Sequence, residues 1–390
     1  MKLRKLLNIA NLYILLWCIY FLQGSLYAEG SIISQGILVL LLLISFYNFY
    51  CANRYYDLPV YFKGLNMLLV MFTLYGGWLM LAGNKLPLGV SNFGYLKQIY
   101  ISLLPIYSSY LYTKKQLLTD TVLMYWIPVW LLVATFSFYF NRQQVLIDLY
   151  DDIEITNNMS YTFLALMPIM VLFRKRPILV FVGILYCMFF ILMGMKRGAI
   201  GISGLVFAYL IFRMYKGGSV KTRFWIFSVL LLAIILLWNL IESLLFNSDY
   251  FAKRIEQTLE GNTSGRDYLV STLLNYFLND ENILTILFGN GADATLYIAS
   301  NYAHNDWIEI LINQGLVGVV VYLVYFILFV KSWRRLKYNY SAYTGVGLIL
   351  LIAFLQTLFS MSYGSMEIYL TISLGYFLAQ PCNDKCISNV

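Results

Sequence analysis

Charge is scarce in this 390-residue chain, in which Asp, Glu, Lys and Arg together make up 12% of the residues. Soluble domains average about 25%. With 61% hydrophobic residues, too few charges are present to cover a water-facing surface, which excludes a soluble globular protein. Apolar runs of about 20 residues, long enough to cross a bilayer, recur along the chain, and they do not alternate as barrel strands do. We therefore expect an all-α, polytopic membrane protein.

Cysteine is also sparse, and its count of five is odd, which argues against a disulfide framework. Cys18 and Cys187 fall within apolar segments, where cysteine acts as a small apolar residue. Cys382 and Cys386 lack the other two ligands that a structural zinc site requires. The cysteines thus indicate neither disulfide bridges nor a zinc site.

Apolar segments predict about twelve transmembrane helices, or eleven if the last two, joined by a short hinge at 364–367, form one. We expect a single transmembrane domain over 1–390. The basic N-terminus could pass for a signal peptide, but no Ala-x-Ala site follows, so an uncleaved first span is expected. The expected spans are about 7–27, 32–50, 64–82, 95–112, 119–138, 159–173, 178–194, 199–215, 224–246, 306–330, 343–362 and 366–380.

The distribution of cations predicts the orientation of these spans. With both termini inside, nineteen of the lysines and arginines fall on inner segments and eight on outer ones, a clear positive-inside bias. The net charge of +8 therefore reflects topology and does not indicate nucleic-acid binding. The eight outer cations are Lys85, Lys97, Arg142, Lys196, Arg197, Lys253, Arg254 and Arg266.

Two outer segments are long and polar. One covers 141–158, and the other, 247–305, is the only predicted extramembrane piece large enough to have its own structure. Within the latter, 250–260 and 267–277 carry apolar residues at helical spacing, which predicts short amphipathic helices on the membrane surface. A tight glycine turn at 288–292 separates them from residue 304.

Three outer residues are candidates for chemistry. His304 is the chain's only histidine, beside Asn and Asp at a membrane boundary, and imidazole can transfer protons at neutral pH. The alternative is a solvated surface histidine. Arg197 lies in a very short turn between apolar spans, where a charge tends to mark function, although it could instead be an interfacial arginine extending towards water. Arg266 begins a surface helix and could bind an anion, or simply pair with Asp267.

Two arginines and a histidine on one face suggest group transfer from a lipid diphosphate. Guanidinium groups grip phosphate oxygens through paired hydrogen bonds and could neutralise a diphosphate as it leaves. A neutral His304 could take the proton of an attacking hydroxyl, with Asp306 or Glu309 orienting the imidazole. Sequence separation alone does not prove that these residues meet.

Three blocks resemble the bacterial O-antigen polymerases and O-antigen ligases, in that family's order. Lys196-Arg197-Gly198-Ala199 is similar to its arginine–glycine turn, although a serine or threonine is usual at the position of Lys196. Gly265-Arg266-Asp267 resembles the start of its large outer loop. The third and most specific block is Phe288-Gly289-Asn290-Gly291, then Ala303-His304-Asn305-Asp306-Trp307, then Gln314-Gly315-Leu316-Val317-Gly318.

The resemblance implies a helical fold like the GT-C class in a bacterial inner (plasma) membrane, with cytoplasmic termini and the site at the periplasmic face. It also implies that Arg197 and Arg266 contact the diphosphate, that His304 is the base, that Asn305 and Asp306 bind substrate, and that no metal or cofactor is needed. Expected partners are undecaprenyl-diphosphate-linked oligosaccharides, the lipid bilayer, a chain-length regulator and a flippase.

Four functions remain open at this point. We favour a polymerase of lipid-linked repeat units for O-antigen (lipopolysaccharide) or capsular polysaccharide, which is a glycosyltransferase. A ligase would differ only in its acceptor, lipid A–core. A secondary transporter would show repeats, broken helices and polar groups at the membrane midplane, whereas the rare charges here gather at the outer face. A membrane scaffold or sensor would not predict clustered Arg and His.

Overall fold

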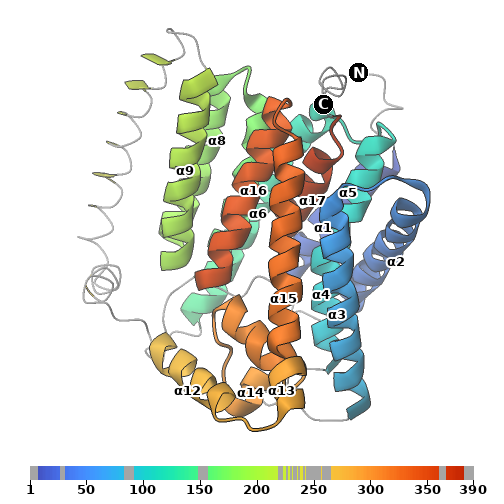
Figure 1. The fold of residues 1–390 in the computed structure, drawn as a ribbon. Helices are drawn as coiled ribbons and strands as arrows, with labels where there is room; N and C mark the ends of the chain where they lie inside the picture. Colours follow the sequence, from blue (N-terminus) through green and yellow to red (C-terminus); the bar gives the residue numbers. More distant parts are fainter. Residues whose placement is uncertain are drawn as a thin grey trace.

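The computed structural model describes residues 8–26, 31–82, 92–147, 157–217, 265–359 and 366–381, with a few single positions between 223 and 256. Its regular elements are helices, and no strand occurs among these residues (Figure 1). Seven of the helices are long and apolar enough to cross a membrane. The all-α prediction is therefore confirmed for the described residues, and the seven apolar helices fit a membrane-embedded protein.

The seven long helices correspond to expected spans. They are α1 (Ile9–Leu26), α2 (Ile32–Tyr55), α3 (Val60–Ala82), α6 (Asp120–Ile147), α9 (Arg197–Gly217), α15 (Asp306–Arg335) and α16 (Tyr340–Phe359). Long apolar runs in helical conformation satisfy most of their own backbone hydrogen bonds, as the bilayer interior requires; Pro128 lies within α6 and Gly315 interrupts α15 near its start.

Other expected spans are shorter or broken. The segment 95–112 forms two helices, α4 (Asn92–Leu103) and α5 (Pro105–Lys114), and 159–173 forms α7 (Ser160–Leu166) followed by the 3-10 helix η4 (Pro168–Phe173). Both breaks fall at a proline, which lacks the N–H that an uninterrupted helix needs. The helices α8 (Pro177–Met193) and α17 (Ile368–Leu378) are also short. The expected span 224–246 lies, apart from single positions, outside the residues that the structure describes.

Three short helices gather at one end of the bundle, which we call the loop end (Figure 1). They are α12 (Arg266–Leu278), α13 (Ile283–Phe288) and α14 (Ala294–Ile298). The long helices α9 and α15 begin at this end and α16 finishes there. The helix predicted at 267–277 is present as α12, and its place on the membrane surface stays a prediction; 250–260 lies outside the described residues.

Aromatic side chains and bonded polar groups fill the interior of the bundle. The hydroxyls of Tyr61 in α3 and Tyr325 in α15 lie 3.0 Å apart, and the Ser332 hydroxyl accepts a 2.8 Å bond from the Tyr61 amide. The buried amide of Asn48 donates to both Ser108 and Tyr112. Such bonds satisfy polar groups that would otherwise be costly to bury. Those of Asn48 join α2 to α5, and those of Tyr61 join α3 to α15, which carries the candidate site.

Candidate active site

Arg266 connects the loop end to the long helices. It is the first residue of α12, after Gly265 in a left-handed conformation (φ 78°). Its Nη1 donates a 3.0 Å hydrogen bond to the carbonyl oxygen of Phe359, the last residue of α16. Carbonyls in the last turn of a helix have no partner within the helix. The guanidinium therefore caps α16 and is held at a fixed place.

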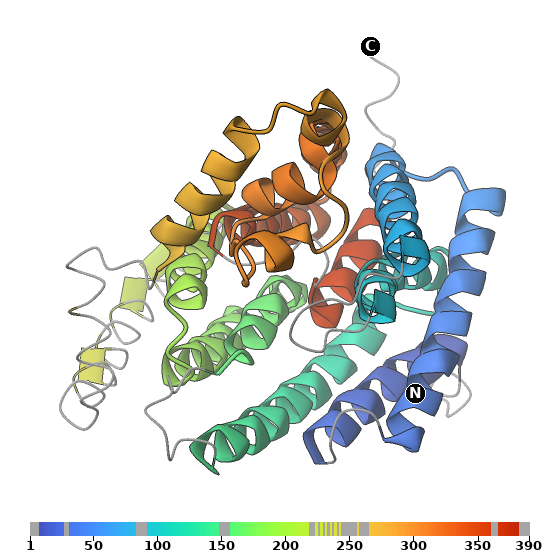
Figure 2. The same ribbon diagram turned by 90° about the horizontal axis from the view of Figure 1, so that it is seen from below.

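Arg197 begins α9 beside the same carbonyl. A methyl group added to its neighbour Gly198 would lie 3.9 Å from the Phe359 oxygen and 2.9 Å from the Tyr161 hydroxyl. The start of α9 and the Arg266 guanidinium thus meet at the end of α16. Figure 2, which views the molecule from below, shows α12 beside the start of α9. Two arginine blocks that are far apart in the sequence come together here.

His304 lies just before α15 and close to two cations. The pKa of its imidazole is lowered below the ordinary value by partial burial and by the positive charges of Arg266 and Lys196. At neutral pH the imidazole is therefore unprotonated and can accept a proton. Its backbone is left-handed (φ 52°), a conformation that is uncommon for residues other than glycine, although histidine is enriched in it.

Asn305 and Asp306 both help to build the start of α15. The Asn305 side chain caps the helix by accepting hydrogen bonds from the amides of Trp307 (3.0 Å) and Ile308 (3.2 Å), as N-cap asparagines do. Asp306 is fully buried and accepts a 2.8 Å bond from the Tyr322 hydroxyl inside the bundle. These contacts give both residues structural roles, and their substrate-binding roles stay predictions.

Glu309 fixes the backbone next to His304. One of its carboxylate oxygens accepts a 2.8 Å bond from the Ala303 amide, and the other accepts bonds from Thr295 and from Asn313 (3.1 Å). The residue is fully buried. Asp306 or Glu309 was predicted to orient the imidazole. The hydrogen bonds of Glu309 hold the backbone immediately before His304, and the orienting role stays a prediction.

Two glycine blocks of the sequence pack directly on each other. Gly315 interrupts α15 in a left-handed conformation (φ 65°), and a methyl group added there would lie 2.5 Å from the Leu287 oxygen and 2.6 Å from the Gly289 nitrogen. The amides of Asn290 and Gly291 donate to the carbonyls of Ile312 (2.9 Å) and Asn313 (3.0 Å), which the break in α15 leaves available. Only glycine allows this close approach, so the two blocks attach the loop end to α15.

Asp293 was not among the predicted site residues. Its side chain is 5% exposed in a left-handed backbone (φ 56°), and burial, together with the nearby charge of Glu309, raises its pKa to about 7. The same two carboxyls and burial raise the pKa of Tyr302 to about 12. An aspartate after a glycine turn is normally predicted to be an exposed turn residue. The burial of Asp293 depends on how the loop folds onto α15.

Among the residues that the structure describes, no three His, Cys, Asp or Glu side chains gather as metal ligands. No protein-family model matches the chain, and no curated protein matches its sequence. Any assignment of function therefore depends on the motifs and on the geometry at the loop end.

Proposed function

We propose that this protein is a glycosyltransferase of the polysaccharide-polymerase type. It would join undecaprenyl-diphosphate-linked oligosaccharide repeats into O-antigen or capsular polysaccharide. One arrangement carries the proposal: the half-buried His304 lies within the field of Arg266 and Lys196, next to the α9 turn that holds Arg197, and burial and these charges lower its pKa. A base and a diphosphate-binding group are what this reaction needs in one place.

In the proposed reaction, His304 accepts the proton of the acceptor sugar hydroxyl. The resulting oxygen attacks the anomeric carbon of the growing glycan and forms the new glycosidic bond. The bond between that carbon and the lipid diphosphate breaks, and the diphosphate leaves with the electron pair. Arg197 and Arg266 would neutralise the charge that develops on it.

The positions of the cations support an orientation with the loop end outside. The guanidiniums of Arg174 and Arg213 both lie 5.4 Å from the ring centre of Tyr340, the first residue of α16. The last residue of α16, Phe359, lies about 30 Å away along a 20-residue helix. Under the positive-inside rule, the Tyr340 end would face the cytoplasm. We extend this to twelve spans in a GT-C-like arrangement in a bacterial inner membrane, with both termini cytoplasmic.

Two alternatives follow from particular features. An O-antigen ligase would use the same donor and site but transfer the glycan to lipid A–core. A secondary transporter is favoured by the proline breaks between α4 and α5 and between α7 and η4, since broken helices are common in transporters. The cations of the candidate site and His304 lie at the loop end, away from those breaks, and this position favours a transferase.

The test is an assay of purified protein with lipid-linked repeat units, measuring elongated glycan and released lipid diphosphate. His304→Ala should lower turnover about 10²–10⁴-fold, the usual contribution of a general base. Arg197→Lys keeps the charge but loses the paired hydrogen bonds, so it should also impair transfer. Glu281→Ala, at an exposed position between α12 and α13, is the control and should be fully active.

Normal elongation by His304→Ala would rule out the proposed base. Transfer of the glycan to added lipid A–core, with lipid diphosphate released only when that acceptor is present, would identify a ligase. Transport of an intact lipid-linked glycan, or of a free solute, across a vesicle membrane without release of lipid diphosphate would identify a transporter.

A further inference from the structure

A second feature of the molecule lies at the end opposite the loop end. An open cavity of about 1010 Å³ is lined by residues of α9, α15 and α16, a volume at the upper end of the usual range for ligand pockets. None of its lining residues belongs to the candidate active site. Ile327 and Phe354, 55% and 44% exposed, lie on its wall, so the cavity opens at the surface of the bundle.

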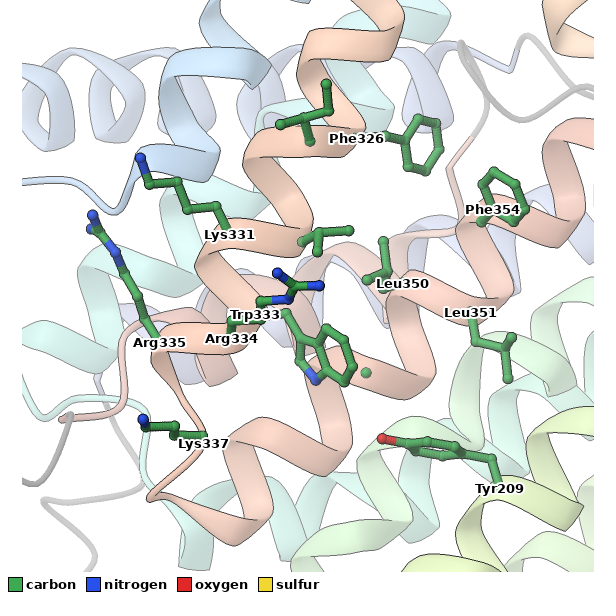
Figure 3. A pocket seen from close by; sticks show the side chains of 13 residues that line it. Tyr209, Phe326, Lys331, Trp333, Arg334, Arg335, Lys337, Leu350, Leu351 and Phe354 are labelled. Atoms are coloured by element: carbon green, nitrogen blue, oxygen red, sulfur yellow. The ribbon is translucent and has the colours of Figure 1, made fainter.

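The wall and floor of the cavity are apolar and aromatic. Phe326, Leu350, Leu351 and Phe354 form the wall in Figure 3, and Trp333 and Tyr209 lie below them. A methyl group added to Gly347 would lie 2.8 Å from the Tyr209 hydroxyl and 2.9 Å from Trp333 Nε1. The glycine thus lets a tyrosine of α9 and a tryptophan of α15 meet on α16, which closes the floor.

The charge at the cavity is of one sign. Its described lining includes Lys331, Arg334, Arg335 and Lys337 and no carboxylate. In sequence, α9 and α16 contain no Asp or Glu, and α15 carries its only acids at the far end. Figure 3 shows the Arg334 guanidinium above Trp333, between the other labelled cations and the apolar wall. A ligand that fits must combine an apolar body with a negative group.

We propose that this cavity binds a diacyl anionic phospholipid from the leaflet at this end of the bundle. Its acyl chains would lie on the wall of Phe326, Leu350 and Phe354, and its phosphate would contact Arg334 and Lys331. Basic pockets between transmembrane helices bind such headgroups, and a guanidinium matches phosphate geometry. In the proposed orientation this is the cytoplasmic leaflet. The site is separate from the active site, so either assignment can fail without the other.

The test is native mass spectrometry of the full-length protein, purified in detergent and titrated with phosphatidylglycerol or phosphatidylcholine of identical acyl chains. We expect phosphatidylglycerol to bind more tightly. The double variant Lys331→Ala/Arg334→Ala should weaken its binding at least about ten-fold, because each cation near a membrane surface contributes about five-fold. Leu351→Trp, which fills the cavity and leaves the cations in place, should weaken binding of the same lipid.

The matched control is Lys175→Ala/Arg176→Ala, which removes two exposed cations at the start of α8. It should leave phosphatidylglycerol binding unchanged. Equal binding of the two lipids, or equal losses in the cavity and control double variants, would overturn the proposal, since both results mean general attraction to charge. Retention of a polyprenyl phosphate in place of phospholipid would show that the lipid class is wrong.

Discussion

At the scale of single residues, the environment of His304 decides which protonation state is available. Burial and two neighbouring positive charges, those of Arg266 and Lys196, lower its pKa, so the neutral imidazole persists at pH values where an ordinary histidine becomes protonated. Arg266, one of the two arginines proposed to bind the diphosphate, therefore also favours the neutral form of the base. This coupling can be measured through the pH dependence of transfer.

We predict that the acid limb of the pH–rate profile lies below about 6.5, the ordinary histidine pKa. Lys196→Gln removes a positive charge that opposes protonation, so the pKa of His304 should rise and the acid limb should move to higher pH. The measurement is initial rate against pH for both proteins. Lys97→Gln, in α4, is the control because Lys97 is not among the charges that lower the pKa of His304. An unmoved acid limb in Lys196→Gln would show that a different group limits the rate.

At the scale of elements, the attachment of α13 to the break in α15 holds the loop end in place. Gly289 and Gly315 approach so closely that neither tolerates a Cβ without movement of backbone atoms. Because Glu309 bonds to the chain before His304 from the same stretch of α15, the position of the candidate base depends on this joint.

Gly315→Ala should destabilise the protein by at least about 1–3 kcal/mol, the cost of a left-handed conformation in a residue other than glycine, with an added clash against Leu287. Thermal unfolding in detergent should show a lower Tm together with reduced activity. Gly201→Ala is the control, because Gly201 has open space around its Cβ position and alanine favours a helix by about 0.5–1 kcal/mol. Equal Tm values for the two variants would contradict the role of the joint.

Asp293 predicts how the stability of the loop end varies with pH. Its folded-state pKa, about 7, is above its unfolded value of 3.8, so the folded state holds a proton that the unfolded chain has lost between these values. Its contribution to stability is therefore greatest at low pH and is lost as pH rises towards 7. The loss should be a few kcal/mol at most, since one pKa unit is about 1.4 kcal/mol.

The measurement is Tm between pH 5 and 8 for the wild type and Asp293→Asn. Asparagine keeps the shape and tolerates the left-handed backbone, so the variant should lose less stability as pH rises. The exposed Glu281→Gln should behave like the wild type. If wild type and Asp293→Asn have parallel pH profiles, the carboxyl of Asp293 is not buried as the structure places it.

At the scale of the whole molecule, α16 separates two groups of cations. Arg174 and Arg213 lie against Tyr340 at its start, and Arg266 contacts Phe359 at its end. A bundle of this kind has one orientation that suits the positive-inside rule, and in that proposed orientation the candidate active site would face outside and the basic cavity would face inside.

Labelling of introduced cysteines tests this orientation. A membrane-impermeant maleimide added to intact cells should react with Asn301→Cys, at an exposed position of the loop end, and not with Tyr338→Cys, which is 51% exposed at the other end. The background should carry Cys382→Ser and Cys386→Ser, while Cys18, Cys51 and Cys187 are buried. Tyr338→Cys should react once the cells are permeabilised. Reaction of Tyr338→Cys in intact cells, with Asn301→Cys protected, would reverse the proposed topology.

Much of the architecture could be predicted because membrane insertion depends on local and additive properties. The hydropathy and length of each apolar run decide whether it can span a bilayer. Composition and length therefore predicted seven helices: α1, α2, α3, α6, α9, α15 and α16. The caps and breaks are also local in origin, since Asn305 and Pro105 act on their own backbone. The outer residues His304, Arg197 and Arg266 could be singled out because charge is rare.

Contacts between distant segments depended on tertiary packing, which no single stretch of sequence determines. Arg266 meets the start of α9 at Phe359, a residue that no motif indicated. Gly289 belongs to a predicted turn and Gly315 to an expected span, and only the fold brings their backbones together. The fold also buries Asp293, and that burial raises its pKa. The sequence by itself determined the class of protein and its candidate residues, because hydrophobicity and charge are properties of each segment. Only the tertiary structure decided which of those residues are neighbours, because proximity and burial are properties of the packed chain.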